Sequence, residues 1–245
     1  MADTLMTHFI AGYPSVEESL KVGKALVAGG ASYLEMQIPY SDPTADGPVI
    51  AAACDEALAA GFKVDRAFDM CRELTSLEGA VPVFLMSYGG IVYNAGVEAF
   101  VARAKEAGAS GLIIPDLAPG ADEGLAEACK KAGLFCVPVL IPGVTDGRME
   151  EVLADKPEWV YLALRRGITG TLTELGPENM DTLDKLKAQN VKIMAGFGIQ
   201  QRSQVESVAP HCDAVIVGSQ VIRTVNECPA GDYSKLEAFV QELIG

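Results

Sequence analysis

Eight short apolar runs alternate with amphipathic helical patterns along the chain, and this alternation is the strongest constraint on its fold. Each run is rich in Val, Ile, Leu, Phe or Tyr and is bounded by Gly, Pro, Asn or Asp, as buried strands are. Because the runs are almost continuously apolar, we expect a parallel sheet covered by helices on both faces. The predicted strands are residues 5–11, 33–38, 81–86, 111–115, 135–141, 159–164, 192–195 and 214–218.

The segments between these runs carry helix signals. The clearest follows the first run, where Ser15 and Glu18 form an S-x-x-E capping box and Gly29 is placed to end the helix. A helical pattern at 49–60 predicts an extra helix after the second strand. One more predicted helix starts at residue 97. The others cover residues 64–74, 121–131, 148–153, 181–188, 203–208 and 233–244.

Eight strand–helix units with no linker and no low-complexity stretch predict one (β/α)8 barrel, a TIM barrel, spanning residues 1–245 as a single domain. The length of 245 residues is usual for this fold. An open doubly wound sheet is the alternative. It is disfavoured because the first strand–helix turn, around Gly12, lacks the G-x-G-x-x-G fingerprint of dinucleotide-binding sheets.

Composition excludes several classes of function. The chain is 49% hydrophobic and 21% charged, which supports a large core. Its formal net charge of −14 argues against nucleic acid and anionic membrane as partners. No run of 18 apolar residues is present, so no membrane span is predicted, and the first residues lack the basic region of a signal peptide. An anionic substrate would need a local positive site such as a helix N-terminus.

The scarcity of metal ligands and of an internal lysine narrows the chemistry. The six cysteines form no C-x-x-C pair, and we expect them to be free, buried thiols. His8 and His211 lie far apart in the sequence, so no metal site is predicted. The only strand lysine, Lys192, stands at the opening end of its strand, on the wrong side for a Schiff-base aldolase.

Glu35 is an ionisable residue within the second predicted strand. Strand alternation places Tyr33, Glu35 and Gln37 on one face, while the apolar Leu34 and Met36 lie on the other. The apolar face should meet the helices, so Glu35 is expected to point into the barrel. A carboxyl group shielded from water there is suited to proton transfer. A paired structural carboxylate is the alternative.

Two aspartates follow in a proline-bounded loop. Asp42 and Asp46 have the character of caps or turn formers, which is the commoner role of loop aspartates. Asp46 is also placed to face the mouth of the pocket as a second carboxylate. Sequence spacing leaves both interpretations open.

Glycine-rich turns follow the later strands. The loop 164–171 suits a mobile lid or a phosphate-binding turn, and an ordinary surface loop is an equal alternative. Gly196-Phe197-Gly198 follows the seventh strand, and Gly218-Ser219 follows the eighth and opens a short helical pattern. Glycines at the ends of these two strands, leading into a helix N-terminus, are typical of the phosphate site of barrel enzymes.

Several of these segments resemble one enzyme family. The stretch 34–48, which contains P-Y-S-D-P-T-A-D-G-P, closely resembles the second-strand signature of tryptophan synthase α subunits. Tyr161 and the R-x-G-I-T-G sequence at 165–170 resemble the sixth-strand tyrosine and closing loop of this family. The turns at 196–198 and 217–219 resemble its two phosphate-site turns. The resemblance covers nearly the whole chain.

The resemblance implies a cytoplasmic lyase of tryptophan biosynthesis. Such an enzyme splits indole-3-glycerol phosphate into indole and glyceraldehyde 3-phosphate, and works with a tryptophan synthase β subunit in an α2β2 complex. Protonation of the indole ring at C3 makes the ring the electron sink for a retro-aldol cleavage. Neither a cofactor nor a metal is therefore expected.

The resemblance also implies roles for individual residues. Glu35 matches the general acid/base of the family, and Asp46 matches the carboxylate that accepts a hydrogen bond from the indole N–H. Asp42 and Pro43 match the loop that contacts the β subunit. The expected substrate-binding residues are Tyr161 beside the indole, Thr169 in the lid, Phe197 after the seventh strand, and Gly170, Gly198, Gly218 and Ser219 around the phosphate.

The chain departs from the family pattern at several positions. Gln37 stands where the family usually has Gly, and it would hydrogen-bond Glu35 or narrow the pocket. His8 stands where an apolar residue usually forms the indole wall, and Arg166 is unusual in the lid. The sequence begins almost directly at its first strand, so we expect a shortened N-terminus without the leading helix of the family.

Two other functions remain as alternatives. The first is a catalytically weak partner that binds ligand and activates the β subunit, and the presence of both Glu35 and Asp46 counts against it. The second is another phosphate-binding barrel enzyme, such as a sugar-phosphate isomerase. The signature at 34–48 counts against that class.

Overall fold

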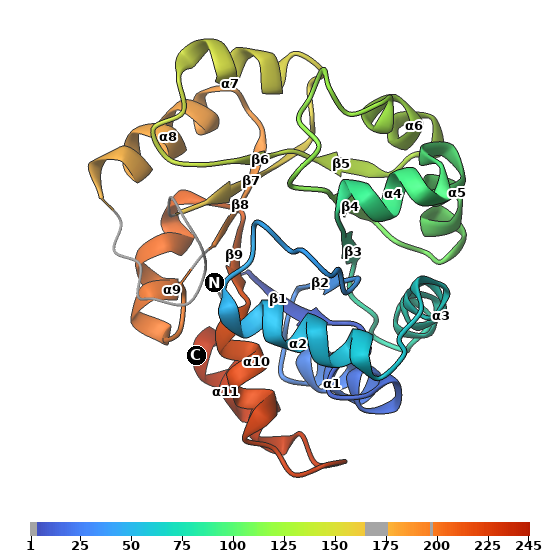
Figure 1. The fold of residues 1–245 in the computed structure, drawn as a ribbon. Coiled ribbons are helices and arrows are strands. Elements are labelled where there is room, and N and C mark those ends of the chain that lie inside the picture. The colour runs from blue at the N-terminus through green and yellow to red at the C-terminus, as the bar shows by residue number, and fades with distance from the viewer. Residues whose placement is uncertain (1–3, 165–175, 197) are drawn as a thin grey trace.

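The strands of this chain form a closed ring surrounded by helices (Figure 1). The computed structural model describes residues 4–164, 176–196 and 198–245. Every strand pairing within this part is parallel, in the order β5-β4-β3-β2-β1-β9-β8-β7-β6. The strands are β1 (Leu5–Ile10), β2 (Tyr33–Gln37), β3 (Val83–Met86), β4 (Gly111–Ile113), β5 (Phe135–Val137), β6 (Val139–Leu140), β7 (Trp159–Ala163), β8 (Lys192–Gly196) and β9 (Ala214–Val217).

The ring closes through a split strand. The segment 135–141, predicted as one strand, is divided at Pro138 into β5, which pairs with β4, and β6, which pairs with β7. Proline has no N–H to donate to a strand ladder. Its carbonyl still accepts a hydrogen bond from the Tyr161 amide at 2.9 Å, which joins the two halves of the ring. The predicted barrel is thus confirmed, with its fifth strand in two pieces.

The helices lie outside the ring, with α1 beside α11 and α2 beside α10 (Figure 1). The predicted extra helix after the second strand is confirmed as α2. The helices of the described residues are α1 (Val16–Ala28), α2 (Pro48–Ala59), α3 (Val64–Thr75), α4 (Gly89–Ala95), α5 (Val97–Glu106), α6 (Leu125–Ala132), α7 (Asp146–Leu153), α8 (Pro177–Ala188), α9 (Arg202–Val208), α10 (Ser219–Asn226) and α11 (Ser234–Ile244).

The contacts at two helix starts differ from those that the sequence pattern predicted. Helix α4 was not predicted, because two glycines obscure its pattern, but the Asp116 carboxylate accepts hydrogen bonds from the Gly89 amide at 2.9 and 3.1 Å and caps it. The capping box of α1 is only half confirmed. Ser15 accepts from the Glu18 amide, while the Glu18 carboxylate accepts from the Gly231 amide and the Tyr233 hydroxyl instead.

Strand alternation divides the core as predicted. Leu34 and Met36 of β2 pack between the sheet and the helices, whereas Tyr33 belongs to the cluster inside the ring. The bottom of the interior, at the amino ends of the strands, is filled by aromatic rings. Phe84 and Trp159 contact Tyr33 edge-on, with ring centroids 6.1 and 5.7 Å from it. The opposite end of the ring is left for the site.

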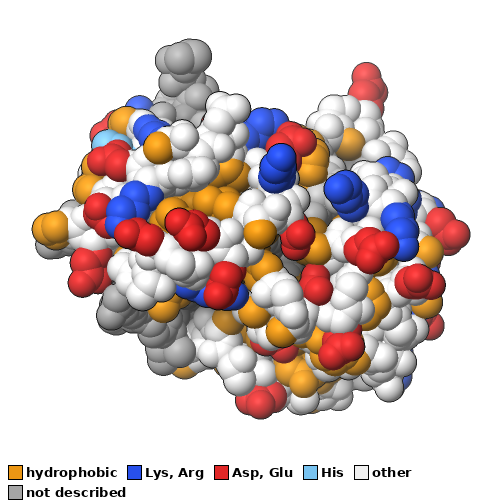
Figure 2. Space-filling model, turned by 90° about the horizontal axis from the view of Figure 1, so that it is seen from above, with side chains coloured by type: hydrophobic (Ala, Val, Ile, Leu, Met, Phe, Trp, Pro, Cys, Tyr) orange, Lys and Arg blue, Asp and Glu red, His pale blue; other side chains and the backbone are white. Residues whose placement is uncertain are grey.

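The surface of the barrel carries side chains of both charge signs (Figure 2). Figure 2 shows the side of the barrel on which α7 lies, where basic side chains are scattered among acidic and hydrophobic ones. No helix in the described ranges has both the length and the apolar character needed to cross a membrane.

All six cysteines are free, as predicted. Cys54, Cys71 and Cys129 are buried, whereas Cys136, Cys212 and Cys228 are only half-buried, so these three are less buried than predicted.

Gly111 in β4 gives a test of the ring packing. A Cβ at this position would lie 2.7 Å from the Phe135 carbonyl oxygen and 2.8 Å from the Phe84 ring. We expect Gly111→Ala to lower the free energy of unfolding by about 1–3 kcal/mol, because backbone must move to admit the methyl group. Urea unfolding measures this.

The control is Gly147→Ala in α7, where a Cβ would meet nothing within 4 Å. Since alanine favours helix, that variant should match the parent or gain about 0.5 kcal/mol. Equal urea midpoints for the two variants would contradict the packing described for β4.

Candidate active site

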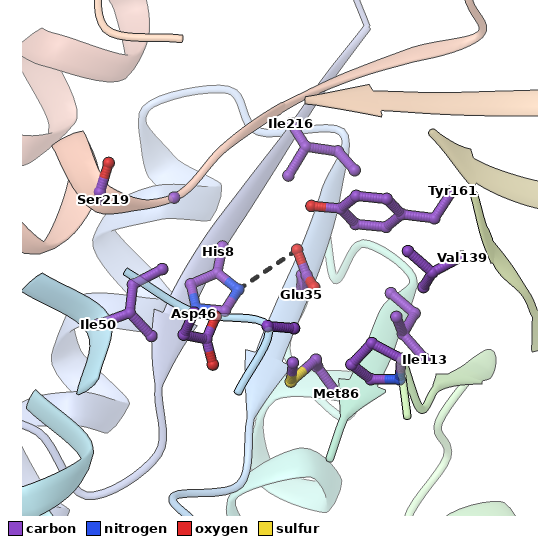
Figure 3. Close-up of a pocket in the computed structure, with 13 residues that line it drawn as sticks. His8, Glu35, Asp46, Ile50, Met86, Ile113, Val139, Tyr161, Ile216 and Ser219 are labelled. Atoms are coloured by element: carbon purple, nitrogen blue, oxygen red, sulfur yellow. Dashed lines mark ion pairs between the residues drawn. The ribbon is translucent and has the colours of Figure 1, made fainter. Parts of the chain in front are cut away.

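A pocket opens at the carboxyl ends of the strands, and Glu35 and Asp46 both line it (Figure 3). The space between its lining atoms, open solvent included, is about 550 Å³. Tyr161 of β7 and the turn Gly218-Ser219 after β9 line it too. Segments far apart in the sequence therefore meet there, as they do at this end of other (β/α)8 barrels.

Glu35 is buried inside the barrel and is paired with His8. The two residues are direct neighbours across β1 and β2, and His8 Nδ1 lies 3.3 Å from Glu35 Oε2 (Figure 3). Their side chains are only 5% and 3% exposed. Burial on its own would lower the pKa of His8, but the carboxylates of Glu35 and Asp46 raise it, with a net increase above the ordinary value.

Asp46 reaches back from its loop to the pocket, so its carboxylate is not merely a turn former. Its Oδ2 accepts hydrogen bonds from Gln37 Nε2 at 2.7 Å and from the Tyr88 hydroxyl at 2.8 Å. Burial raises the pKa of Asp46, and His8 and these two donors partly oppose the increase. Both donors act on one oxygen, which leaves Oδ1 for other partners. Asp42, in contrast, is exposed on the loop.

Apart from these groups the pocket walls are largely apolar. Met86, Ile113, Val139 and Ile216 line it from four different strands. The Tyr161 ring lies on the opposite side of Glu35 from His8 (Figure 3), and burial raises its pKa well above the usual value. The arrangement is a slot with apolar walls and two carboxylates on one side. Such a slot suits a planar apolar group that exchanges protons with its surroundings.

The turn Gly218-Ser219 leads directly into α10. Ser219 is buried as the first residue of this helix, and a Cβ on Gly218 would lie 3.5 Å from the Cβ of His8. The first amides of a helix have no partners within the helix and can bind an anion. Gly198, after β8, has φ +74, which favours glycine, but it is not among the described residues that line the pocket.

Some predicted site residues cannot be placed. Thr169, Gly170 and Phe197 lie outside the described residues, as does the proposed lid from residue 165 onward. Among the described residues, no group of three or more His, Cys, Asp or Glu side chains is arranged to hold a metal ion.

Two residues have partners that sequence reasoning missed. Gln37 was expected to hydrogen-bond Glu35 or narrow the pocket, but its amide donates to Asp46, because the loop after β2 folds back over that strand. Tyr88 has no role in the sequence prediction, yet its hydroxyl donates to Asp46 and accepts from the Ala45 amide. No local pattern around Tyr88 signals this, since the two partners are more than 40 residues away.

Comparison with known proteins matches this arrangement to one family. The family model described as "Tryptophan synthase alpha chain" matches residues 2–243. The chain belongs to the tryptophan synthase alpha chain family. The tryptophan synthase alpha chain of Syntrophotalea carbinolica is 35% identical over 240 residues, covering 98% of this chain and 93% of the relative.

Solved structures of the family have the same fold. A Mycobacterium tuberculosis tryptophan synthase chain superposes with a TM-score of 0.90 at 30% identity, covering 99% of this chain and 91% of that one. A chain from the tryptophan synthase α2β2 complex of Pyrococcus furiosus gives a TM-score of 0.88 at 30% identity, with both chains fully covered. The likeness to this family thus extends over the whole barrel.

The contact between Tyr88 and Asp46 can be tested in this family member. Tyr88→Phe removes a donor to a shielded carboxylate, so the pKa of Asp46 should rise further. Hydrogen bonds to charged groups contribute about 1.5–3 kcal/mol, and we expect a loss of that size in urea unfolding at pH 7. The loss should shrink at acidic pH, where Asp46 becomes protonated and the charge disappears.

The control is Tyr40→Phe, because the Tyr40 ring stacks on Tyr88 at 5.1 Å. It should stay within about 0.5 kcal/mol of the parent at both pH values. A Tyr88→Phe loss that does not change with pH would show that the hydroxyl does not act through the Asp46 charge.

Proposed function

We propose that this chain cleaves indole-3-glycerol phosphate to indole and glyceraldehyde 3-phosphate by a retro-aldol reaction. The observation that carries the proposal is that Glu35 and Asp46 line one pocket with apolar walls, in a chain of the tryptophan synthase alpha chain family. Carboxylates are able to supply acid/base chemistry without a cofactor or a metal, and the indole ring takes up the electrons.

Glu35 is the general acid and base of this proposal. A proton delivered to indole C3 makes the ring nitrogen cationic, and Asp46 Oδ1 then accepts the hydrogen bond from its N–H. The carbon attached to C3 carries a glycerol hydroxyl, and removal of the proton from this hydroxyl converts the carbon to an aldehyde. The bond between it and C3 breaks, and its electron pair returns to the ring. One proton enters and one leaves, so the site is restored.

Substrate binding divides between two parts of the site. We place the indole beside Tyr161, between the apolar walls, and the phosphate at the turn Gly218-Ser219. Gly198 keeps its predicted role as a phosphate-binding residue. The first amides of α10 then supply the positive end of a helix to the anion. Thr169, Gly170 and Phe197, which lie outside the described residues, keep their predicted roles in lid closure and binding.

A β subunit is the proposed partner. The solved complex from Pyrococcus furiosus is described as a tryptophan synthase α2β2 complex with mutual activation. We infer that this chain contacts such a subunit through its exposed Asp42 and the neighbouring Pro43, which stiffens the loop. We place the activity in the cytoplasm, as part of tryptophan biosynthesis.

Glu35→Gln tests the proposed reaction. The amide keeps the shape of the side chain but cannot take or give the proton, so indole release should fall by about 10²- to 10⁴-fold. The assay follows indole released from indole-3-glycerol phosphate, with circular dichroism as a check of the fold. Activity within threefold of the parent would remove Glu35 from the mechanism, and no release by the parent would favour the ligand-binding alternative.

Gly218→Asp tests the proposed phosphate site. The new carboxylate would stand at the N-terminus of α10 and repel a phosphate group. We expect the Kd for glycerol 3-phosphate, measured by calorimetry, to rise at least about tenfold, as one repulsive contact charge implies.

The matched control is Gly218→Ala, because a Cβ there makes only ordinary contact with His8 at 3.5 Å. It should bind glycerol 3-phosphate within about threefold of the parent. An unchanged Kd in Gly218→Asp would place the phosphate elsewhere.

A further inference from the structure

Three buried polar atoms at the proposed catalytic site have no hydrogen-bond partner in the described part of the chain. They are Glu35 Oε2, which has only the ion-pair contact with His8, and the neighbouring atoms His8 Nε2 and Gln37 Oε1. Gln37 is the next residue after Glu35 on the inner face of β2, diagonal to His8 on β1. The Gln37 side chain acts on His8 by raising its pKa. An unpaired buried polar atom is costly, so two such neighbours call for an explanation.

The orientation of the Gln37 amide follows from its other contact. Its Nε2 donates to Asp46 Oδ2 at 2.7 Å, and a carboxylate can only accept, so Nε2 is correctly placed there. Oε1 must then point the other way, as an acceptor. A neutral His8 that gives its single N–H to Glu35 would present a second acceptor to Oε1. An imidazolium has a donor on each nitrogen and satisfies both neighbours.

We propose that His8 is an imidazolium that links the two site carboxylates, donating Nδ1–H to Glu35 and Nε2–H to Gln37 Oε1, while Gln37 holds Asp46. Four side chains then form one hydrogen-bonded bridge across the floor of the pocket: Glu35, His8, Gln37 and Asp46, with Tyr88 as the last donor to Asp46. His8 and Gln37 act as positioning residues. Their catalytic consequence rests on the proposed function.

The charges around His8 support this state. The titratable groups that act on it are Glu35 on β2 and Asp46 on the following loop, and the tyrosines Tyr88 and Tyr161 lie next to these two carboxylates. Among the described residues that line the pocket, none is Lys or Arg, so no other cation opposes the imidazolium. Its positive charge also offsets one of two carboxylates in a site proposed to take an anionic phosphate ester.

The bridge gives Glu35 a source and a store for its proton. The proton that Glu35 delivers to C3 comes from His8 Nδ1, so that Glu35 is again a carboxylate and His8 is neutral. Glu35 then takes the proton of the glycerol hydroxyl and passes it to His8, which restores the imidazolium. Proton count and charge are the same before and after the cycle. Without His8, Glu35 has no neighbouring group from which to take this proton or to which to return it.

The protonation of His8 can be measured in the intact protein without any activity. The chain has two histidines, so ¹⁵N-histidine spectra contain two imidazoles, and His211→Gln identifies the His8 signals. We expect both nitrogens of His8 to be protonated at pH 7.5, a pH that lies about one unit above the ordinary pKa of histidine. In Gln37→Met, which removes the acceptor of Nε2–H, the titration midpoint should fall. A neutral His8 at pH 7.5 in the parent would overturn the proposal.

Kinetics test the effect on the site. We expect His8→Gln to lower kcat for indole release about tenfold at pH 7. The acid limb of its pH profile should move up by about one pH unit, which is the usual effect of losing an opposite charge a few ångström away. KM should change less than kcat. The matched control, His211→Gln, should keep both kcat and the profile.

The outcomes separate this proposal from the proposed function. A His8→Gln profile that superimposes on the parent would overturn the positioning role. A parent that holds a doubly protonated His8 but releases no indole would support the bridge and reject the proposed function.

Discussion

Closure of the parallel sheet on itself is the constraint from which the rest of this structure follows. In a closed ring every second side chain of a strand points inward, away from both water and the helices. Tyr33, Glu35 and Gln37 are inside for this reason, although they stand in a strand whose other residues are apolar. The closure itself depends on Pro138, whose carbonyl bonds to β7 where the strand is broken.

Burying a charged group in the barrel interior costs free energy unless hydrogen-bond donors surround the charge. In this site such donors are present. Asp46 has two donors on one oxygen, and Glu35 has His8 within 3.3 Å. The aromatic rings of Tyr33, Phe84 and Trp159 fill the other end of the interior. The polar groups are therefore confined to the end where the loops supply partners and where a substrate can enter.

Two of the departures from the family pattern, His8 and Gln37, have a common location. Taken separately, His8 removes an apolar wall and Gln37 fills a space that glycine would leave open. In the fold they lie on adjacent strands, and each contacts one of the two carboxylates. Replacing His8 or Gln37 alone by an apolar residue would leave the buried side chain of the other without its polar neighbour. The pair is thus best understood as one feature of this chain, with consequences for how the carboxylates share charge.

Much of this protein follows from its sequence alone. Apolar runs of strand length, the helix signals between them and the alternation in β2 were enough to predict the barrel, the extra helix α2 and the inward position of Glu35. These features depend on the local period of the chain, which is visible in a single sequence. The family signature at 34–48 extended that prediction to the reaction.

Other features were decided by tertiary structure. The break at Pro138 changes the ladder only because β4 and β7 lie on either side of it. The Glu18 carboxylate leaves its own helix for Gly231 and Tyr233, which are more than 200 residues away. The choice of Asp46 as the partner of Gln37 depends likewise on how a loop folds back over its strand. Such contacts join positions with no fixed sequence spacing, so periodicity holds no information about them, and only the folded chain brings their atoms within bonding distance.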